Sequence, residues 1–471
     1  MADGASIEFR TAPGAPMALT IVVQDDGPGR VFTLADDARR QIYRLPDRRQ
    51  ASYLDAFADW ARDWGCRAPL SRSEAPPPSF EAPLRPLLTR PVSPRILYGY
   101  GDPCVTRAVD PATGRPTYYL LVSSNDAPDA FPILKSEDLA QWRLAGFVFA
   151  EGGAPGWTLT GEGRADFWAP EMHRVGDEYW VCFTARRQDR SLAIGIARSA
   201  SPEGPFTAGP APVLGDGVID AHILLDRDGA PLLFWKEDAN GLWPPLLAEL
   251  LHGRGDLIAS LFPAAPDART AALLAALWPW TRTIEPMEQF FVLQPLIEAV
   301  TEDFAAFGDR MRAAIGREPA LAPAAWPILA AMKTRVHAQR LRADGQNLVG
   351  DRRLIVENDQ TWEAHLIEGV WVTEHAGRYY LFYSGNDFST HHYGIGAAVA
   401  DAPLGPYRKL DPLLRSTREW SGPGHPSVAP GPDGAPMLFL HAFMPGQVGY
   451  KAFRALLCAR LAFGSDGPRL V

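Results

Sequence analysis

Cysteine is scarce in this chain, and its few residues are widely spaced. The four cysteines, Cys66, Cys104, Cys182 and Cys458, show no C-x-x-C spacing among 471 residues. Such spacing signals neither a zinc motif nor a disulfide framework. We therefore expect reduced, mostly buried thiols.

Long apolar runs and clusters of one charge are missing as well. No run approaches the roughly 18 apolar residues that span a bilayer, and the N-terminus lacks a basic segment followed by an apolar stretch. We therefore expect a cytoplasmic protein with no membrane partner. A net charge of -9 without a dense Lys/Arg run argues against nucleic acid. It favours a neutral or cationic small substrate.

An internal repeat organises what is present. The segments "GRPTYYLLVS", "GDEYWVCFTA", "GAPLLFWKE", "GRYYLFYSG" and "GAPMLFLHA" each place a turn glycine before an aromatic and β-branched run, which is typical of a buried strand. Their glycines, at 114, 176, 229, 377 and 434, are separated by 62, 53, 148 and 57 residues. Without an insertion of about 90 residues, the long interval shrinks to about 58, so five units of similar length remain.

Further strands follow the first, second and fourth hairpins, and two of these segments, "AIGIARSASPEGPF" and "YGIGAAVADAPLGPY", share a final turn. Four-stranded units repeated five times around an axis predict a mainly β fold, a five-bladed β-propeller. A β-sandwich with chance similarity is the alternative. The propeller is expected over residues 97–471.

A polar residue begins the strand that enters each hairpin. These residues are Asp102 in "YGDPCV", Glu171 in "WAPEMH", Asp220 in "IDAHIL", Glu368 in "IEGVWV" and His425 in "GHPSV". Because the first strand of each blade is innermost, the five side chains are expected to converge near the axis. Clustered carboxylates repel one another and lose hydration, so a purely structural core would not gather them. The pattern indicates a functional site.

These motifs resemble those of glycoside hydrolase family 43, in order and over Leu97 to about Phe463 apart from the insertion. The segments "FWKEDANG", "TRVHAQRLRADGQNLVG" and "QTWEAHLIEGVWV" are most similar to its α-L-arabinofuranosidase and β-xylosidase branches. The resemblance implies that Asp102 is the general base, Glu368 the general acid and Asp220 the group that tunes the acid. Two departures are Ala221 and Val370, which stand where proline is common. The insertion is a third, and it leaves the substrate length open.

The chemistry of glycoside cleavage needs the same groups. One carboxyl group protonates the leaving oxygen and another deprotonates water, about 6.5–9.5 Å apart when the configuration inverts. A neighbouring ionised carboxylate such as Asp220 favours the protonated form of Glu368. Asp102 must stay ionised, so we expect hydrogen-bond donors around it.

Flanking residues give weaker signals. Phe167 and Trp168 are candidates for a sugar platform or for packing. Glu171 and His222 are candidates for substrate binding, and Glu171 is expected to support the pocket by hydrogen bonds rather than to transfer protons. His391 and His392 lack the helical spacing of a zinc motif and are expected at most at the pocket rim. His425 is a candidate for an axial water or, as the resemblance implies, a structural calcium ion, although a satisfied core histidine is equally compatible. No cofactor is otherwise expected.

Two regions lie outside the expected propeller. Residues 1–74 alternate apolar and polar positions and then show helical spacing, which predicts a small N-terminal α+β appendage. A Pro-rich linker is expected over 75–96. Residues 243–332 change to a helical period, so we expect a helical insertion in blade three. It is a candidate lid or a surface for a homodimer.

Together these features lead to one hypothesis with two alternatives. The leading hypothesis is an inverting exo-glycoside hydrolase that releases terminal α-L-arabinofuranosyl or β-D-xylosyl units from short oligosaccharides. A non-catalytic sugar-binding propeller and a retaining, fructosidase-like hydrolase are the alternatives. In the last, the two carboxyl groups would lie only about 5–5.5 Å apart.

Overall fold

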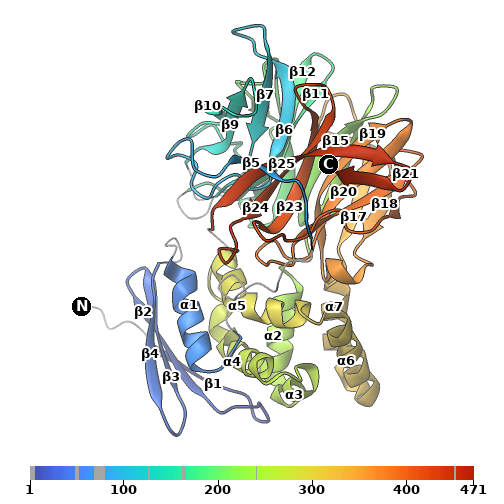
Figure 1. The fold of residues 1–471 in the computed structure, drawn as a ribbon. Helices are drawn as coiled ribbons and strands as arrows, with labels where there is room; N and C mark the ends of the chain where they lie inside the picture. The colour runs from blue at the N-terminus through green and yellow to red at the C-terminus, as the bar shows by residue number, and fades with distance from the viewer. Residues whose placement is uncertain are drawn as a thin grey trace. The chain divides into compact units, whose positions relative to one another are not determined.

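The computed structural model shows a mainly β chain that divides into two compact units (Figure 1). The described residues are 6–47, 52–67, 80–125, 128–161, 166–239, 241–449 and 452–471. One unit comprises residues 1–75 and 239–333, and the other comprises residues 76–238 and 334–471. We call them the α+β unit and the sheet unit.

A four-stranded antiparallel sheet forms the first part of the α+β unit. Its strands, in order, are β1 (Ser6–Arg10), β2 (Thr20–Asp26), β3 (Gly29–Ala35) and β4 (Arg40–Leu45), and helix α1 (Ser52–Asp63) contacts β4. Along β2, Ile21 and Val23 are buried while Gln24 and Asp25 are exposed. One face of the sheet is therefore apolar and needs a covering layer.

Helices form the second part of the α+β unit. They are α2 (Trp243–Gly253), α3 (Ile258–Leu261), α4 (Ala265–Thr281), α5 (Pro286–Thr301), α6 (Phe304–Arg317) and α7 (Ala322–Ala331). Proline stands in the first turn of α2, α4, α5 and α7, where its missing N–H costs no helical hydrogen bond.

The sheet and the helices of this unit pack on each other, although the sequence predicts them as separate parts at 1–74 and 243–332. The rings of Phe32 and Trp280 meet edge to face at 5.2 Å. Nε of Arg67 donates to Asp267 at 2.6 Å, and its backbone N–H donates to Thr270 at 2.7 Å. The apolar face of the N-terminal sheet thus finds its covering layer about 200 residues later in the chain.

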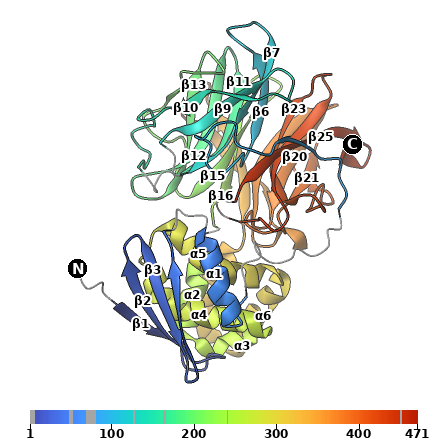
Figure 2. The same ribbon diagram turned by 60° about the vertical axis from the view of Figure 1, so that its left-hand side comes forward.

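Within the described residues, the sheet unit contains five antiparallel sheets in chain order (Figures 1 and 2). The first consists of β6 (Cys104–Val109), β7 (Pro116–Leu121), β9 (Ala130–Ser136) and β10 (Arg143–Phe149). The second consists of β8 (Ser124–Asn125), β11 (Asp166–Val175), β12 (Glu178–Arg186), β13 (Leu192–Ser199) and β14 (Thr207–Ala208). The third consists of β15 (Val218–Leu225), β16 (Pro231–Glu237), β17 (Arg335–Leu341) and β18 (Leu348–Glu357).

The fourth and fifth sheets complete this unit. The fourth consists of β19 (Ile367–His375), β20 (Arg378–Gly385), β21 (Gly394–Ala400) and β22 (Arg408–Lys409). The fifth consists of β23 (Ser421–Pro430), β24 (Pro436–Phe443), β25 (Arg454–Gly464) and β26 (Gly467–Leu470), with β5 (Arg85–Leu88) paired to β25. The predicted linker 75–96 therefore contains a strand of the last sheet, and its residues 75–79 lie outside the described part of the chain.

The leading strands of the five sheets contact one another in a closed cycle. Strand β6 contacts β11, β11 contacts β15, β15 contacts β19, β19 contacts β23, and β23 contacts β6. Large apolar side chains fill the spaces between neighbouring sheets, as in the cluster of Phe131, Phe149, Phe167 and Phe183. The cycle brings together residues that are more than 300 positions apart in the sequence.

Each leading strand carries the same bulge near its start. Three residues of the leading strand span two residues of its partner: from Trp168 to Glu171, from Ile219 to His222, from Glu368 to Trp371 and from Gly424 to Ser427. In the first sheet the same offset runs from Gly101, whose carbonyl accepts the Ser123 N–H, to Cys104. A β-bulge redirects the side chain of its extra residue, so these bulges determine which residues face the cycle.

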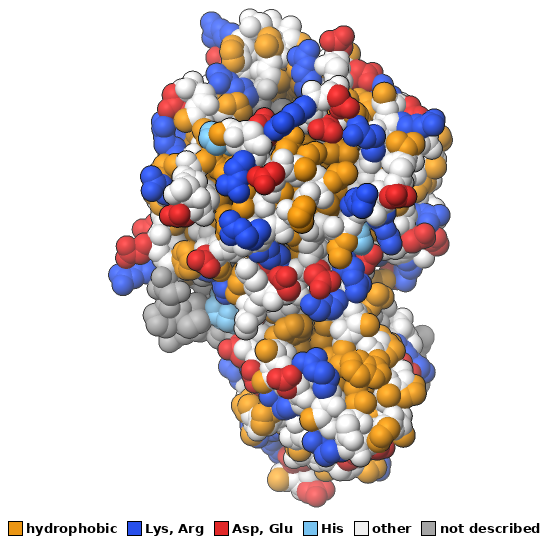
Figure 3. All heavy atoms as spheres, turned by 90° about the vertical axis from the view of Figure 1, so that its right-hand side faces the viewer, with side chains coloured by type: hydrophobic (Ala, Val, Ile, Leu, Met, Phe, Trp, Pro, Cys, Tyr) orange, Lys and Arg blue, Asp and Glu red, His pale blue; other side chains and the backbone are white. Residues whose placement is uncertain are grey.

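The predictions about thiols and surface can be examined in the same structure. All four cysteines are buried and free, as predicted. On the face drawn in Figure 3, acidic and basic side chains of the sheet unit are interspersed. No helix of the described residues combines the length and apolar character needed to cross a membrane.

Candidate active site

The bulges place three of the predicted polar residues at one equivalent position. The extra residues are Asp102, Ala169, Asp220, Gly369 and His425, and all five have positive φ angles, between 45° and 57°. Asp102, Asp220 and His425 therefore share one register position, as predicted. Glu368 stands one residue before its bulge and Glu171 two residues after its own, so the expected fivefold register is wrong for these two.

Glu171 belongs to a separate layer of side chains, together with His222. Both follow their bulge residues by two positions, and Nδ1 of His222 lies 2.7 Å from Oε2 of Glu171. Nε2 of His173 lies 2.9 Å from the same oxygen, and Nε2 of His222 accepts the Val372 N–H at 3.1 Å. His222 is 1% exposed and both its nitrogens are engaged. The prediction that His222 contacts substrate is therefore corrected: it joins neighbouring strands.

Asp102 is surrounded by donors, as the sequence predicts for an ionised group. Nη1 of Arg454 donates to Oδ1 at 2.9 Å, and the hydroxyl of Ser123 donates to Oδ2 at 2.5 Å. Burial would raise the pKa of Asp102, but Arg454, the nearby histidines and Ser123 together hold it well below its ordinary value. The carboxylate stays ionised and 16% of its side-chain surface is exposed, so it is accessible to a small molecule.

Asp220 has the opposite electrostatic environment. Its pKa is raised to about 6, mainly by burial, with the negative charges of Glu368 and Asp102 adding to the effect. His425 and Lys236 oppose the shift without cancelling it. Oδ2 of Asp220 also accepts the backbone N–H of Gly369 at 2.9 Å, so the carboxyl group is tied to the strand that carries Glu368.

Glu368 has one donor on each carboxylate oxygen. Nζ of Lys236 lies 2.9 Å from Oε2, and the hydroxyl of Tyr393 lies 2.9 Å from Oε1. About 10% of the Glu368 side chain is exposed. The site thus combines two carboxyl groups that influence each other, Asp220 and Glu368, with a third, Asp102, that is held ionised. Such a division of environments is what acid–base chemistry by carboxyl groups requires.

His425 lies between the carboxylates, and the residues around it do not supply a set of calcium ligands. Its Nδ1 is 3.5 Å from Oδ1 of Asp102, whose oxygens already accept bonds from Arg454 and Ser123. Calcium takes six to eight oxygen ligands, and these residues do not offer them. An ion beside His425 would keep its water ligands, and a water or calcium ion there stays a prediction. Among the described residues, the group with three ligand-type atoms within 4.8 Å of one another is Glu171, His173 and Cys182.

The two aromatic candidates have different environments. Phe167 is 3% exposed, and its ring meets Phe131 edge to face at 5.6 Å. It is a core residue, which corrects the prediction of a sugar platform there, because its ring has no free face. Trp168 is partly exposed, with Nε1 donating to Oδ1 of Asn125 at 2.5 Å and the Arg186 guanidinium 5.5 Å from the ring. Trp168 remains a candidate platform.

His391 and His392 directly precede Tyr393 in the chain. Their rings lie 4.1 Å apart, His391 is 8% exposed, and its carbonyl accepts the hydroxyl of Ser416 at 2.6 Å. Their position next to Tyr393 places them beside the site, and a role at the rim stays a prediction.

Sequence reasoning did not single out four side chains that contact the site carboxylates or their strands. They are Ser123, Lys236, Tyr393 and Arg454. Lys236 is inside the quoted segment "FWKEDANG", so a charge within a buried strand was available as a signal. Arg454 lies on the third strand of the last sheet, and no local pattern links it to Asp102. Only closure of the cycle brings them together.

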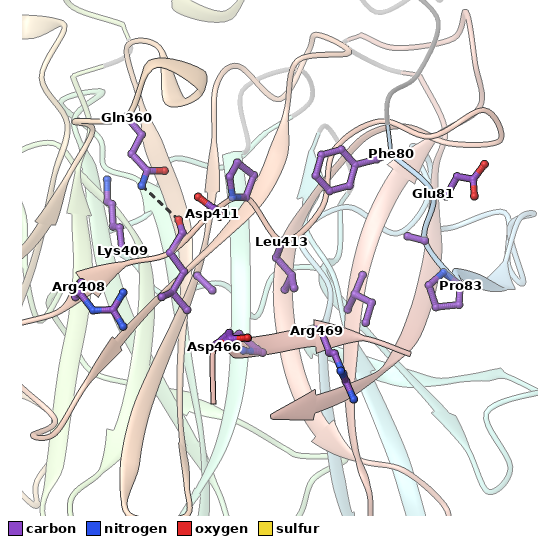
Figure 4. Close-up of a pocket in the computed structure, with 16 residues that line it drawn as sticks. Phe80, Glu81, Pro83, Gln360, Arg408, Lys409, Asp411, Leu413, Asp466 and Arg469 are labelled. Carbon is purple, nitrogen blue, oxygen red and sulfur yellow. Dashed lines mark hydrogen bonds between the residues drawn. The ribbon is translucent and has the colours of Figure 1, made fainter. Parts of the chain in front are cut away.

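Two hollows of the sheet unit relate differently to this site. A small one beside Asp102 is lined by Gly101, Ser123, Asn125 and Arg454, among others. A larger pocket of about 510 Å³ lies between the β22 segment and β26 (Figure 4). In it Gln360 donates to the Leu410 carbonyl, and the lining residues include none of the site carboxylates. Size alone therefore does not locate the chemistry.

Most glycoside hydrolases use a pair of carboxyl groups in contrasting environments. A sequence model of glycosyl hydrolases family 43 matches residues 94–250 and 321–468. The chain belongs to this family, as its motifs predict.

Relatives and solved structures agree with this membership. The chain is 28% identical to xylosidase/arabinosidase 43A of Humicola insolens over 259 residues, 54% of this chain and 61% of that protein. It is 23% identical to a xylosidase/arabinosidase of Bacteroides ovatus, over 62% of this chain and 68% of the relative. The crystal structure of a thermostable family-43 glycoside hydrolase matches 81% of this chain and 95% of its own, with a TM-score of 0.55 and 25% identity.

Proposed function

We propose that the protein is an inverting exo-glycoside hydrolase that releases terminal β-D-xylosyl or α-L-arabinofuranosyl units from short oligosaccharides. The observation that carries the proposal is the contrast between Asp102, held ionised by Arg454, and the mutually repelling pair Asp220 and Glu368. In this proposal Asp102 deprotonates water, Glu368 protonates the leaving oxygen, and Asp220 tunes and orients Glu368.

The proposal includes a five-bladed propeller in which the five sheets are the blades. The closed cycle of contacts between β6, β11, β15, β19 and β23 supports this arrangement, as does the bulge shared by the five leading strands. In a propeller, blades one and four lie across the axis from each other. A water molecule would then fit between Asp102 and the anomeric carbon, as single-step inversion requires.

The proposed substrate class follows from the relatives' names and from the site. Xylosidase/arabinosidase activity is named for the relatives in Humicola insolens and Bacteroides ovatus. The partly exposed Trp168 offers an apolar face for a sugar ring, and the exposed surface of the carboxylates is small. A site of this kind suits a terminal sugar unit better than the middle of a polymer.

A screen of aryl glycosides tests the activity. Aryl β-D-xylopyranoside, α-L-arabinofuranoside, galactopyranoside and fructofuranoside are incubated with the wild-type protein and with Asp102→Asn, Asp220→Asn and Glu368→Gln. We expect the first or second substrate to be cleaved, and each variant to lose about 10²–10⁴-fold in kcat while remaining folded. No cleavage of any of them would contradict the proposed function, and full activity in one variant would remove that residue from its role.

The stereochemistry needs a separate measurement. Proton NMR of the first-formed sugar is expected to show an anomeric configuration opposite to that of the substrate. A product that retains the configuration would overturn the inverting mechanism and favour a covalent intermediate on Asp102.

A further inference from the structure

One position of the second strands recurs in all five sheets. It pairs with the residue that precedes each bulge, and it is occupied by Ser123, Thr184, Lys236, Ser384 and His441. In four sheets this side chain accepts the N–H of the bulge residue in the next sheet of the cycle. The donor–acceptor distances are 2.8 Å for Ala169 to Ser123, 3.1 Å for Asp220 to Thr184, 2.7 Å for His425 to Ser384 and 3.0 Å for Asp102 to His441.

Lys236 of the third sheet breaks this pattern. An ammonium group has three donors and no lone pair, so it cannot accept the N–H of Gly369 in the fourth sheet. Oδ2 of Asp220 accepts that N–H instead, at 2.9 Å. The exception therefore falls at the junction that holds Asp220 and Glu368.

The side chain of Lys236 is 0% exposed and faces carboxylates. Its Nζ lies 2.9 Å from Oε2 of Glu368 and 3.8 Å from Oδ1 of Asp238. Burying an ammonium group costs free energy that only close anionic partners offset. A serine or threonine, as at the same position of other sheets, would join the sheets without that cost. The lysine therefore has a purpose beyond closing the cycle.

We propose that Lys236 is a positioning residue that fixes Oε2 of Glu368 as an acceptor, so that the proton transferred in catalysis resides on Oε1. The proposal rests on the proposed hydrolase function. A proton on Oε2 would point at an N–H donor, whereas the partner of Oε1 is the Tyr393 hydroxyl, which can rotate and accept as well as donate. Tyr393 is also hydrogen bonded to Ser384, so its hydroxyl has a second partner when Oε1 is protonated.

The transfer then balances at named atoms. The Oε1–H bond breaks as its proton passes to the leaving oxygen, and the electron pair of the cleaved anomeric C–O bond stays on that oxygen. Water adds to the anomeric carbon and gives one proton to Asp102. The carboxylate left on Glu368 accepts from Lys236 at Oε2 and from Tyr393 at Oε1, which is the arrangement seen in the structure.

Two substitutions of Lys236 test the assignment. Lys236→Met removes the donor and keeps the length of the side chain, whereas Lys236→Thr supplies the acceptor found at this position of the second sheet. Both are assayed on aryl glycosides with poor and good leaving groups, from unsubstituted phenyl to dinitrophenyl, across pH. We expect kcat on the phenyl glycoside to fall about 10²-fold in both variants, with KM little changed and a much smaller loss on the dinitrophenyl glycoside.

Lys135→Met is the matched control. Lys135 is a buried lysine of the first sheet that is paired with Asp110 and Glu203 and has no contact with the site. We expect it to lower the melting temperature without changing the pH profile or the leaving-group dependence. Thermal unfolding of all the variants separates loss of folding from loss of positioning, and Lys236→Thr keeps the test usable if Lys236→Met does not fold.

The outcomes distinguish this inference from the proposed function. An active wild type with unchanged kcat in Lys236→Thr, or with equal losses on both leaving groups, overturns the positioning role alone. A wild type that cleaves none of the glycosides overturns the proposed function and this inference with it.

Discussion

Among the groups that keep Asp102 ionised, the guanidinium of Arg454 has the largest effect. Arg454 donates to Oδ1, and a Cβ atom at Gly101 would lie only 1.8 Å from Cζ of Arg454. The absence of a side chain at position 101 is therefore what lets the arginine reach the carboxylate. Arg454 supplies the positive charge beside Asp102, and Gly101 leaves the space that the arginine side chain occupies.

Arg454→Met and Gly101→Ala should both raise the pKa of Asp102, because each removes or displaces its strongest cation. Above the pKa of Asp102 the base is ionised and active, so a rise in that pKa moves the acid limb of the pH–rate profile upward, from below the measured range in the wild type into that range in the variants. Steady-state kinetics between pH 3 and pH 7 measure the shift. The control is Arg460→Met, on the same strand as Arg454. It breaks the ion pair between Arg460 and Asp433 and should leave the acid limb in place. An unshifted limb in Arg454→Met would contradict the assignment of Asp102 as the base.

Asp220 makes the folded chain less stable at neutral pH. Its pKa of about 6 exceeds the ordinary aspartate value of 3.8, so the folded state binds a proton more readily than the unfolded chain does. The penalty is fully present above about pH 6, shrinks as the pH falls, and is absent below about pH 4; the difference corresponds to about 3 kcal/mol.

Asp220→Asn should therefore raise the free energy of unfolding at pH 8, by up to about 3 kcal/mol, while losing activity. The asparagine oxygen can still accept the Gly369 N–H. Urea denaturation at pH 8 and pH 4 measures the difference from the wild type, which should be large at the first pH and near zero at the second. The exposed Asp177→Asn serves as control. An equal difference at both pH values would show that ionisation of Asp220 is not the cause.

Among the elements, strand β23 affects the site because it has a glycine where a larger residue would collide with Tyr393. A Cβ atom at Gly424 would lie 1.8 Å from the ring of Tyr393, whose hydroxyl donates to Glu368. Gly424→Ala should displace Tyr393 and lower kcat, to about the level of Tyr393→Phe, which removes the hydroxyl without crowding. We expect a loss of about tenfold or more in each. Gly146→Ala is the control, because a Cβ atom there would meet no atom of a non-neighbouring residue within 4 Å. Wild-type kcat in Tyr393→Phe would show that the hydroxyl is dispensable.

The sequence predicts some features of the leading strands and misses others. The turn glycines and aromatic runs predict the hairpins of the five sheets, and the motifs around Asp102, Asp220 and His425 predict their common position. The bulge itself has no residue signature, since Ala169 and Gly369 occupy it in the other two sheets. The position of a glutamate relative to the bulge depends on how the strand pairs with its neighbour, and no local sequence pattern reveals this pairing. Glu171 and Glu368 were therefore assigned to the wrong register.

At the scale of the whole molecule, the missing information was the pairing of distant segments. The apolar face of β2 and β3 indicates that a cover exists, but nothing near it in the sequence names the helices that supply it. Lys236 and Arg454 were overlooked for the same reason, because their partners belong to other sheets. The family resemblance points to the carboxylates and not to the groups that contact them.

The two-segment construction changes how the insertion must be tested. Removing residues 239–333 alone would expose the apolar residues that pack around Trp280, so we expect that variant to aggregate. Removing residues 1–75 as well, with a Gly/Ser turn joining β16 to β17, should leave a folded sheet unit. Size-exclusion chromatography and circular dichroism compare the two variants, and activity on xylo- and arabino-oligosaccharides of increasing length follows. A soluble, folded single deletion would contradict the interdependence of the segments. If the double deletion alters neither length preference nor oligomeric state, the α+β unit is neither a lid nor a dimer surface.

The two segments of the α+β unit are synthesised at different times. A ribosome adds about 5–20 residues per second, so the N-terminal sheet emerges about 10 to 50 s before synthesis passes residue 333 and completes the helices that cover it. Until those helices are made, the sheet lacks most of its covering layer, although α1 already contacts β4. Two complete sheets and part of a third of the other unit are made in the same interval. Chaperone demand during synthesis should therefore be concentrated on the first segment, long before the residues that perform the chemistry are all present.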